Sequence, residues 1–182
     1  MENMKILAID PGPKQSGWVI IDGEYQVIGS GVMNNQEARD HIRNFALYSD
    51  APRLAIEQIA CMGMAVGAET FQTCVWTGRF IEIFADETGS DEAITQIPRV
   101  PIKVHLCGTA KAKDPNIRQA LIDRYGGSDA IKKHRPEKRN RKGEVTSQEV
   151  EAGALAGVTA HAWAALAVAV VYLDRVKAGI AQ

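Results

Sequence analysis

Residues 5–12 read KILAIDPG, in which four consecutive apolar residues precede an aspartate and a Pro-Gly pair. A short apolar run that ends in turn residues is typical of a buried strand. Asp10 then lies where the strand leaves the core, and carboxylates are rarely buried unless they are paired or bind a metal. Asp-Pro-Gly is also a common turn sequence. On this stretch alone, Asp10 is therefore about equally well explained as a turn residue and as a functional carboxylate.

Two further apolar runs follow the first one directly. Residues 17–21 read GWVII and residues 25–28 read YQVI, and the pair Asp22-Gly23 stands between them. Asp-Gly between two apolar runs is a strong hairpin signal. The sequence therefore predicts a meander of three antiparallel strands, with Asp10 at the end of the first.

A second acid ends a later apolar run. Residues 36–48 have the apolar spacing of an amphipathic helix, and residues 54–58, LAIEQ, then form another predicted strand with Glu57 near its end. If this strand is parallel to the first, both carboxylates reach the same edge of the sheet. Ligands of open α/β sheets bind at that edge.

The rest of the chain alternates between predicted helices and less regular segments. We expect a helix over residues 68–86 and, because Pro98 and Pro101 interrupt residues 94–106, one or two strands there near a sheet edge. Asp114 is expected to cap a helix with Pro115 at its first position, and Gly126-Gly127 ends it. The last helix is expected from near Thr159 to about Lys177.

Composition points to one soluble domain of 182 residues with a formal net charge of −1. The longest apolar run, residues 162–173, is shorter than a membrane span, and no basic-then-apolar leader precedes the first strand. An odd number of cysteines without metal-binding spacing predicts reduced, partly buried thiols at Cys61, Cys74 and Cys107. We therefore expect a cytoplasmic protein, without a membrane partner or a small-molecule cofactor.

One segment is strongly basic in a chain that is close to neutral. Residues 132–142 hold seven Lys or Arg and one acidic residue in eleven positions, within a stretch at about 127–151 that is predicted to be a flexible loop. Phosphate-rich nucleic acid is favoured as its partner over a merely solvated loop. The candidate nucleic-acid contacts, here and in the segment before it, are Lys111, Lys113, Arg118, Lys132, Lys133, Arg135, Lys138, Arg139, Arg141 and Lys142.

The two strand-end acids are ligands of the kind that Mg²⁺ prefers, and two such ions about 4 Å apart can activate a phosphodiester. A site of this type needs three or four ligands, so another must come from elsewhere. His161, near the start of the last helix, is a candidate. On the residues alone, a histidine hydrogen-bonded to the backbone is the favoured interpretation.

Four motifs in order resemble the RuvC-type Holliday junction resolvases of the RNase H-like superfamily. They are Asp10-Pro11-Gly12 with the following Ser-Gly-Trp, the AIEQ run around Glu57, the basic loop GTAKAK at 108–113, and the helix at 162–170. The resemblance extends over about residues 5–172. It implies one RNase H-like nuclease domain over residues 1–182, with a mixed five-stranded sheet, three antiparallel strands then parallel ones, flanked by helices.

The resemblance also implies a setting, a bacterial cell or a phage-infected host, and an activity. The family cuts four-way DNA junctions as a homodimer by symmetric nicks, using Mg²⁺, which Mn²⁺ is expected to replace. Asp10 and Glu57 become metal ligands that activate a water, His161 matches the first of two C-terminal metal-binding positions, and Lys113 becomes a phosphate contact. The dimer face is expected on the helix after the Glu57 motif, where Phe71, Val75 and Phe84 are either interface or ordinary core residues.

Position 164 departs from the family pattern. Ala164 stands where a metal-binding Asp is expected, three residues after His161. Three explanations stay open: a divergent site completed by Glu149 or Glu151, an engineered Asp→Ala replacement, or a protein that binds junctions without cutting them. Asp174 is an unsuitable substitute, because thirteen residues of helix place it roughly 20 Å from His161. An RNase H-like nuclease acting on structured RNA is a further alternative.

Overall fold

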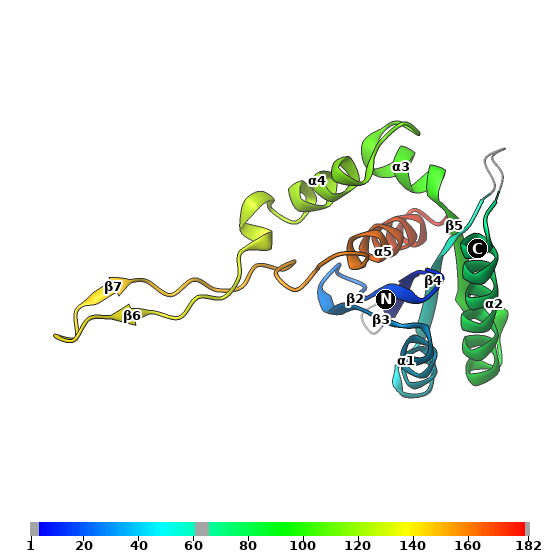
Figure 1. Cartoon of the computed structure of the whole chain (residues 1–182), viewed down its shortest axis with the longest axis horizontal. Coiled ribbons are helices and arrows are strands. Elements are labelled where there is room, and N and C mark those ends of the chain that lie inside the picture. Colours follow the sequence, from blue (N-terminus) through cyan, green and yellow to red (C-terminus); the bar gives the residue numbers. More distant parts are fainter. Residues whose placement is uncertain (1–3, 61–65, 181–182) are drawn as a thin grey trace.

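The computed structural model describes residues 4–60 and 66–180 and is built on one five-stranded sheet (Figure 1). The strand order is β3-β2-β1-β4-β5. β1 pairs antiparallel with β2, and β2 with β3, whereas β1–β4 and β4–β5 are parallel. The predicted mixed sheet is therefore confirmed. Its strands are β1 Lys5–Asp10, β2 Gln15–Asp22, β3 Val27–Asn34, β4 Pro52–Gln58 and β5 Ile94–Pro98.

Helices cover both faces of the sheet, which explains why residues 6–9 of β1 are all apolar rather than alternating with polar residues. Ile6 and Ala8 belong to a core shared with α5 (Ala162–Lys177). Leu7 and Ile9 point to the opposite face and pack with α1 (Asn35–Tyr48) and α2 (Ala68–Thr88). In Figure 1, α5 lies on one side of the sheet and α1 and α2 lie on the other.

The last helix begins later than the sequence predicts. Ala160 has a φ of 43°, a left-handed conformation that an α-helix does not contain. The helix therefore starts at Ala162, with His161 as its N-cap residue. The body of α5 is almost entirely buried on the sheet and the neighbouring helices, and its many alanines permit this close packing.

The prediction for residues 94–106 is only half right. β5 is an edge strand as expected, but Arg99–Cys107 forms helix α3. Pro98 ends the strand in an extended conformation, and Pro101 falls in the first helical turn, where its missing N–H breaks no helical hydrogen bond. α4 (Asp114–Arg124) starts one residue earlier than predicted, because Lys113 and not Asp114 is the N-cap residue.

The basic segment has more structure than the predicted loop. A short helix, η2 (Gly127–Ile131), leads into a two-stranded antiparallel hairpin of β6 (Lys138–Arg139) and β7 (Val145–Ser147). An isolated bridge between Arg135 and Val150 joins the hairpin near its base. We call residues 132–150 the arm, because they extend far from the sheet and its helices (Figure 1).

Two smaller predictions concern the cysteine thiols and membrane-spanning helices. Cys74 is exposed rather than partly buried, Cys107 is half-buried, and both are free thiols within the described part of the chain. Cys61 lies outside the described residues. Across residues 4–60 and 66–180, no helix has the length and apolar character needed to cross a bilayer.

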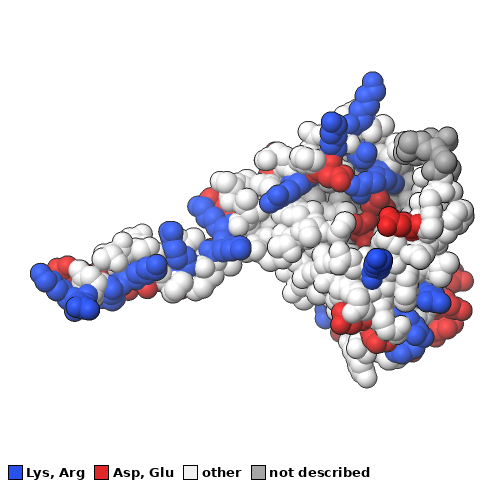
Figure 2. Space-filling view, in the orientation of Figure 1, with Lys and Arg blue, Asp and Glu red and all other residues white. Residues whose placement is uncertain are grey.

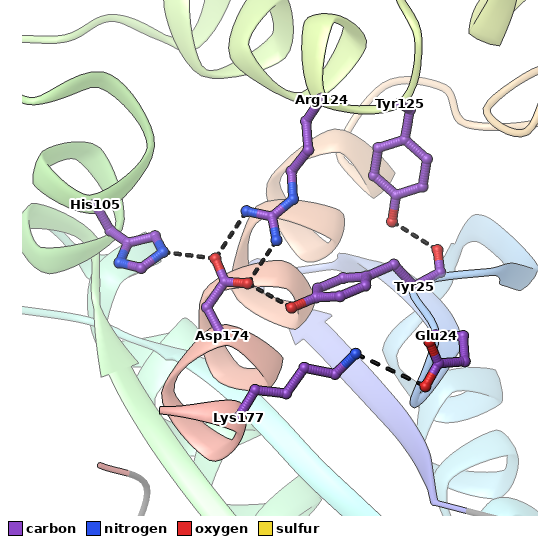
Figure 3. A network of polar contacts seen from close by, with 7 residues as sticks. All are labelled: Glu24, Tyr25, His105, Arg124, Tyr125, Asp174 and Lys177. Atoms are coloured by element: carbon purple, nitrogen blue, oxygen red, sulfur yellow. Dashed lines mark hydrogen bonds and ion pairs between the residues drawn. The ribbon is translucent and has the colours of Figure 1, made fainter. Parts of the chain in front are cut away.

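A polar network fixes the far end of α5 (Figure 3). Asp174 accepts hydrogen bonds from Arg124 of α4 at 2.8 Å and from the Tyr25 hydroxyl at 2.6 Å. His105 Nε2 of α3 lies 2.6 Å from the same carboxylate. Asp174 thus joins α3, α4 and the β2–β3 turn to α5, and it stands apart from His161 as the sequence predicts.

We expect Asp174→Asn to destabilise the protein by about 2–3 kcal/mol at pH 7, because it weakens hydrogen bonds to a charged group. Burial opposes ionisation, but the hydrogen bonds from Arg124, Tyr25 and His105 outweigh it and lower the pKa of Asp174. A lowered pKa stabilises the fold above the unfolded-state value, near pH 4, and this contribution is lost as pH falls through the folded-state value. Urea unfolding of both proteins at pH 7 and at about pH 3 checks this. A difference that stays constant between these pH values would refute it.

Candidate active site

A cavity of about 790 Å³ lies where β1 and β4 end. Asp10, the last residue of β1, and Glu57, near the end of β4, both line it. Because β1 and β4 are parallel neighbours, their carboxyl ends reach the same edge of the sheet. The structure therefore brings together the two acids that the strand pattern places at this edge.

Both carboxylates are largely buried. Their negative charges repel each other. Burial raises the pKa of Asp10, although Arg99 and His161 lower it in part. Burial and then the neighbouring Asp10 charge raise the pKa of Glu57 to about 7, against the opposing effect of Arg99. Two acids that resist joint ionisation in one cavity are a favourable site for a cation.

Arg99, the first residue of α3, is a cavity residue that the sequence pattern does not indicate. Its Nη1 donates to Glu57 Oε2 at 2.7 Å, and its Nη2 donates to Asp114 Oδ1. Burial disfavours the charged guanidinium, but Glu57 and Asp114 overcome this and raise the pKa of Arg99. Arg99 thus connects the end of β4 to the start of α4.

His161 reaches the cavity from the start of α5. Its Nδ1 lies 3.4 Å from Asp10 Oδ2, and its side chain is 61% exposed. Gly17, paired with Asp10 across the β1–β2 ladder, allows this approach. A Cβ at position 17 would lie 2.3 Å from the carbonyl oxygen of His161, so only glycine lets the backbone of α5 come this close.

Gly17→Ala is therefore expected to push the start of α5 and His161 away from Asp10. Overpacking against backbone costs about 1–3 kcal/mol of stability. Gly78→Ala on α2 is the matched control, because a Cβ there meets open space, and it should stabilise the helix by up to about 1 kcal/mol. Urea unfolding of both variants measures the difference, and equal stability of the two would contradict this account of Gly17.

The cavity also shows what stands at position 164. Ala164 lines the wall but has no side-chain oxygen, while Glu69 of α2 and Asp114 of α4 line it as well. Glu149 lies in the arm, 4.0 Å from His134, and is largely exposed. Neither it nor Glu151 lines the cavity, so the idea that one of them completes the site finds no support.

A metal site must be judged on these side chains. Among the described residues, no group of three or more His, Cys, Asp or Glu side chains is arranged to hold a metal ion. Mg²⁺ often takes only one or two protein carboxylates and completes its shell with water and phosphate oxygens. Asp10 and Glu57 fit that smaller requirement.

Basic side chains lie in the cavity, in the loop before α4 and along the arm. Lys14 and Arg118 line the cavity, and Arg118 stacks over the Trp163 ring at 4.8 Å. Lys111 lies in the loop between α3 and α4, and Lys113 ends it as the cap of α4. The remaining predicted contacts lie on the arm, and Figure 2 shows Lys and Arg along its length.

Some of the arm's charges are already paired. Lys132 Nζ lies 2.7 Å from Asp129, and Arg139 Nε lies 2.6 Å from Glu137. Both pairs are solvent-exposed, so each contributes little to stability and dissociates easily. The arm therefore remains able to offer these cations to phosphate.

The sheet order, the helices on both faces and the two acids at one edge define the RNase H-like fold of the RuvC type. Two solved structures share it, "Thermus thermophilus RuvC structure" and "T. thermophilus RuvC in complex with Holliday junction substrate". The first has a TM-score of 0.63 and 16% identity, and the match covers 98% of this chain and 99% of the other. The second has a TM-score of 0.64 and 16% identity, and the match covers 98% of each chain.

Comparison at the sequence level gives no match. No protein-family model matches this chain, and no curated protein does. The resemblance to RuvC resolvases, predicted from four short motifs, is thus confirmed by structure, and at 16% identity the likeness establishes the fold.

Proposed function

We propose that this protein is a divalent-metal-dependent endonuclease that nicks four-way DNA junctions. The observation that carries the proposal is the pair of largely buried carboxylates, Asp10 and Glu57, in one cavity at the carboxyl edge of the sheet. The RuvC-type fold supports it, since one neighbour was solved with a Holliday junction substrate. The basic arm supports binding to nucleic acid.

Each cavity residue has a role in this proposal. Asp10 and Glu57 hold Mg²⁺ or Mn²⁺, which supplies charge neutralisation at the phosphate and activates water when bound. His161, 3.4 Å from Asp10, orients the attacking water. Lys14, Lys113 and Arg118 lie in or beside the cavity and hold the DNA backbone by phosphate contacts.

The test is incubation with Mg²⁺ and end-labelled substrates: a synthetic four-way junction, a linear duplex of the same sequence, and a structured RNA. We expect nicks in the junction and little product from the other two. Nicking of all three at similar rates would contradict junction selectivity. Cleavage of the RNA alone would select an RNA nuclease instead.

Ala164 favours a second candidate function, a junction-binding protein that does not cut. In that case the missing carboxylate leaves binding intact and removes turnover. A gel shift with junction DNA, without nicks in either Mg²⁺ or Mn²⁺, would select it.

We propose further that the protein acts as a homodimer through the first half of α2. Phe71 and Val75, one helical turn apart, are 60% and 54% exposed there, and a neighbouring pair of exposed apolar side chains supports an interface on this face. Phe84 has a different role, because it is completely buried in the core with Leu7 and Ile9. It cannot be part of this face.

Replacing both Phe71 and Val75 by Asp should therefore convert the dimer into a folded monomer, since it places charges in an apolar interface. Light scattering after size-exclusion chromatography gives the mass, and circular dichroism gives the fold. Tyr48→Asp, on an exposed side chain at the end of α1, is the control and should leave the dimer intact. A wild-type monomer at micromolar concentration would contradict the proposed dimer.

A further inference from the structure

The cavity contains a built-in cation, Arg99. Its guanidinium bridges Glu57 at the end of β4 and Asp114 at the start of α4. Those two hydrogen bonds use two of the five N–H groups that an arginine carries. The side chain is 31% exposed and lines the cavity, so its other N–H groups are available to a bound phosphate.

The charge in the cavity is suited to one divalent ion rather than two. Four carboxylates and three cationic side chains line it, a formal net charge of −1; they are Asp10, Glu57, Glu69, Asp114, Lys14, Arg99 and Arg118. One divalent ion changes this to +1, which matches a single scissile phosphate. A second ion would leave +3, a strongly unfavourable excess at a partly buried site.

The side-chain oxygens available as metal ligands also suit one ion rather than two. Glu57 Oε2 already accepts a hydrogen bond from Arg99, so Oε1 is the Glu57 oxygen that would be offered to an ion held with Asp10. At position 164, where a second ion would need a ligand, the wall of the cavity is a methyl group. The side chains thus provide for one ion and, beside it, a fixed guanidinium.

We propose that Arg99 takes the place of a second metal ion, so that cleavage uses one divalent ion and one guanidinium. This inference rests on the proposed nuclease function. Arginine is permanently charged and its planar fork matches phosphate oxygens. Held by Glu57 and Asp114, Arg99 donates to a non-bridging oxygen of the scissile phosphate and stabilises the charge that develops there.

The reaction it assists is a balanced hydrolysis. The oxygen of the attacking water bonds to phosphorus, and the bond from phosphorus to the leaving oxygen of the DNA strand breaks. One water proton ends on the leaving oxygen, and the other is released to solvent. No oxidant, reductant or further reactant is needed.

Counting bound Mn²⁺ by electron paramagnetic resonance tests the inference without relying on activity. We expect one ion per protomer in the wild type and two in the double variant Arg99→Gln/Ala164→Asp, which removes the guanidinium and adds a carboxylate. Circular dichroism of the double variant checks that it is folded, so that a gain of one ion reports on the cavity. Two ions in the wild type, or one in the double variant, would overturn the inference.

Junction cleavage at saturating Mn²⁺ gives a second readout. Arg99→Gln should lower kcat about 100-fold, the usual effect of removing one such donor, with little change in junction affinity. Arg99→Lys keeps the charge and should retain more of kcat than Arg99→Gln. An unchanged kcat in Arg99→Gln would also overturn the inference.

The two proposals fail in different ways. A wild type that nicks junctions with two bound ions keeps the proposed function and refutes only the role of Arg99. A wild type that binds no Mn²⁺ and nicks no junction refutes the proposed function, and the role of Arg99 with it.

Discussion

Asp10→Asn is expected to slow junction nicking about a thousand-fold, which corresponds to about 4 kcal/mol of activation free energy. Asn keeps the shape of the side chain but removes the negative charge that attracts a divalent ion. Glu57→Gln should have a similar effect, because both carboxylates line the same cavity. Single-turnover rates on a synthetic junction at saturating protein and Mg²⁺ measure the loss.

Junction affinity should be unchanged or slightly higher in both variants, since each removes negative charge near the DNA. Asp40→Asn is the matched control: Asp40 is an exposed carboxylate on α1 and does not line the cavity. It should nick at the wild-type rate. Equal rates for the wild type, Asp10→Asn and Glu57→Gln would contradict the proposed site.

Neutralising the arm is expected to have the largest effect on binding. Replacing Lys138, Arg139, Arg141 and Lys142 by Ala removes four cations from the hairpin and its turn. If each meets a phosphate, the slope of log K against log salt becomes less steep by about 3–4. Junction Kd values measured by fluorescence anisotropy at several salt concentrations give that slope.

The length of the arm adds a geometric expectation. Ten extended residues, 132–141, span at most about 33 Å, a distance of about ten base pairs of duplex. The arm should therefore contact a junction arm away from the crossover. The four-residue variant should bind about 25-base-pair arms much more weakly than the wild type does, and about 8-base-pair arms almost equally well.

A variant with the opposite charge change serves as the control. Glu137, Glu144 and Glu149 are the acidic residues of the arm, and replacing them by Gln should strengthen binding to long junction arms. If the basic variant loses the same affinity for short and long arms, the arm does not follow the duplex. If neither variant changes affinity, the arm does not bind DNA.

Local pattern was enough to predict the parts of the fold that decide where the acids lie. The continuous apolar runs before Asp10 and around Glu57 predict strands buried on both faces, and such strands are parallel neighbours in the structure. The Asp22-Gly23 signal likewise predicts the hairpin between β2 and β3. These features depend on short-range chemistry, which the sequence displays directly.

Errors arose where one local signal has two physical outcomes. Proline is compatible with an edge strand and with the first turn of a helix, so Pro101 does not distinguish β structure from α3. Thr159 is a good cap residue, but the left-handed Ala160 delays α5. Residues 132–142 look like a solvated loop by composition, yet they pair as part of a hairpin.

The composition of the cavity depended on long-range packing. Arg99, Glu69 and Asp114 come from the starts of α3, α2 and α4, and no spacing in the sequence relates them to Asp10. Only Asp114 had a weak sequence signal for a place near the site, since it directly follows Lys113, a predicted phosphate contact. The contact between Arg99 and Glu57 becomes visible only when β5 is placed beside β4.

The central claim is that Asp10 and Glu57 together hold a divalent ion against a DNA phosphate. Anomalous X-ray diffraction from crystals grown with a junction and saturating Mn²⁺ tests it most directly. We predict an anomalous peak within coordination distance of one oxygen from each of the two carboxylates. No peak in the cavity, or a peak on Asp10 with Glu57 turned away from it, would contradict the claim.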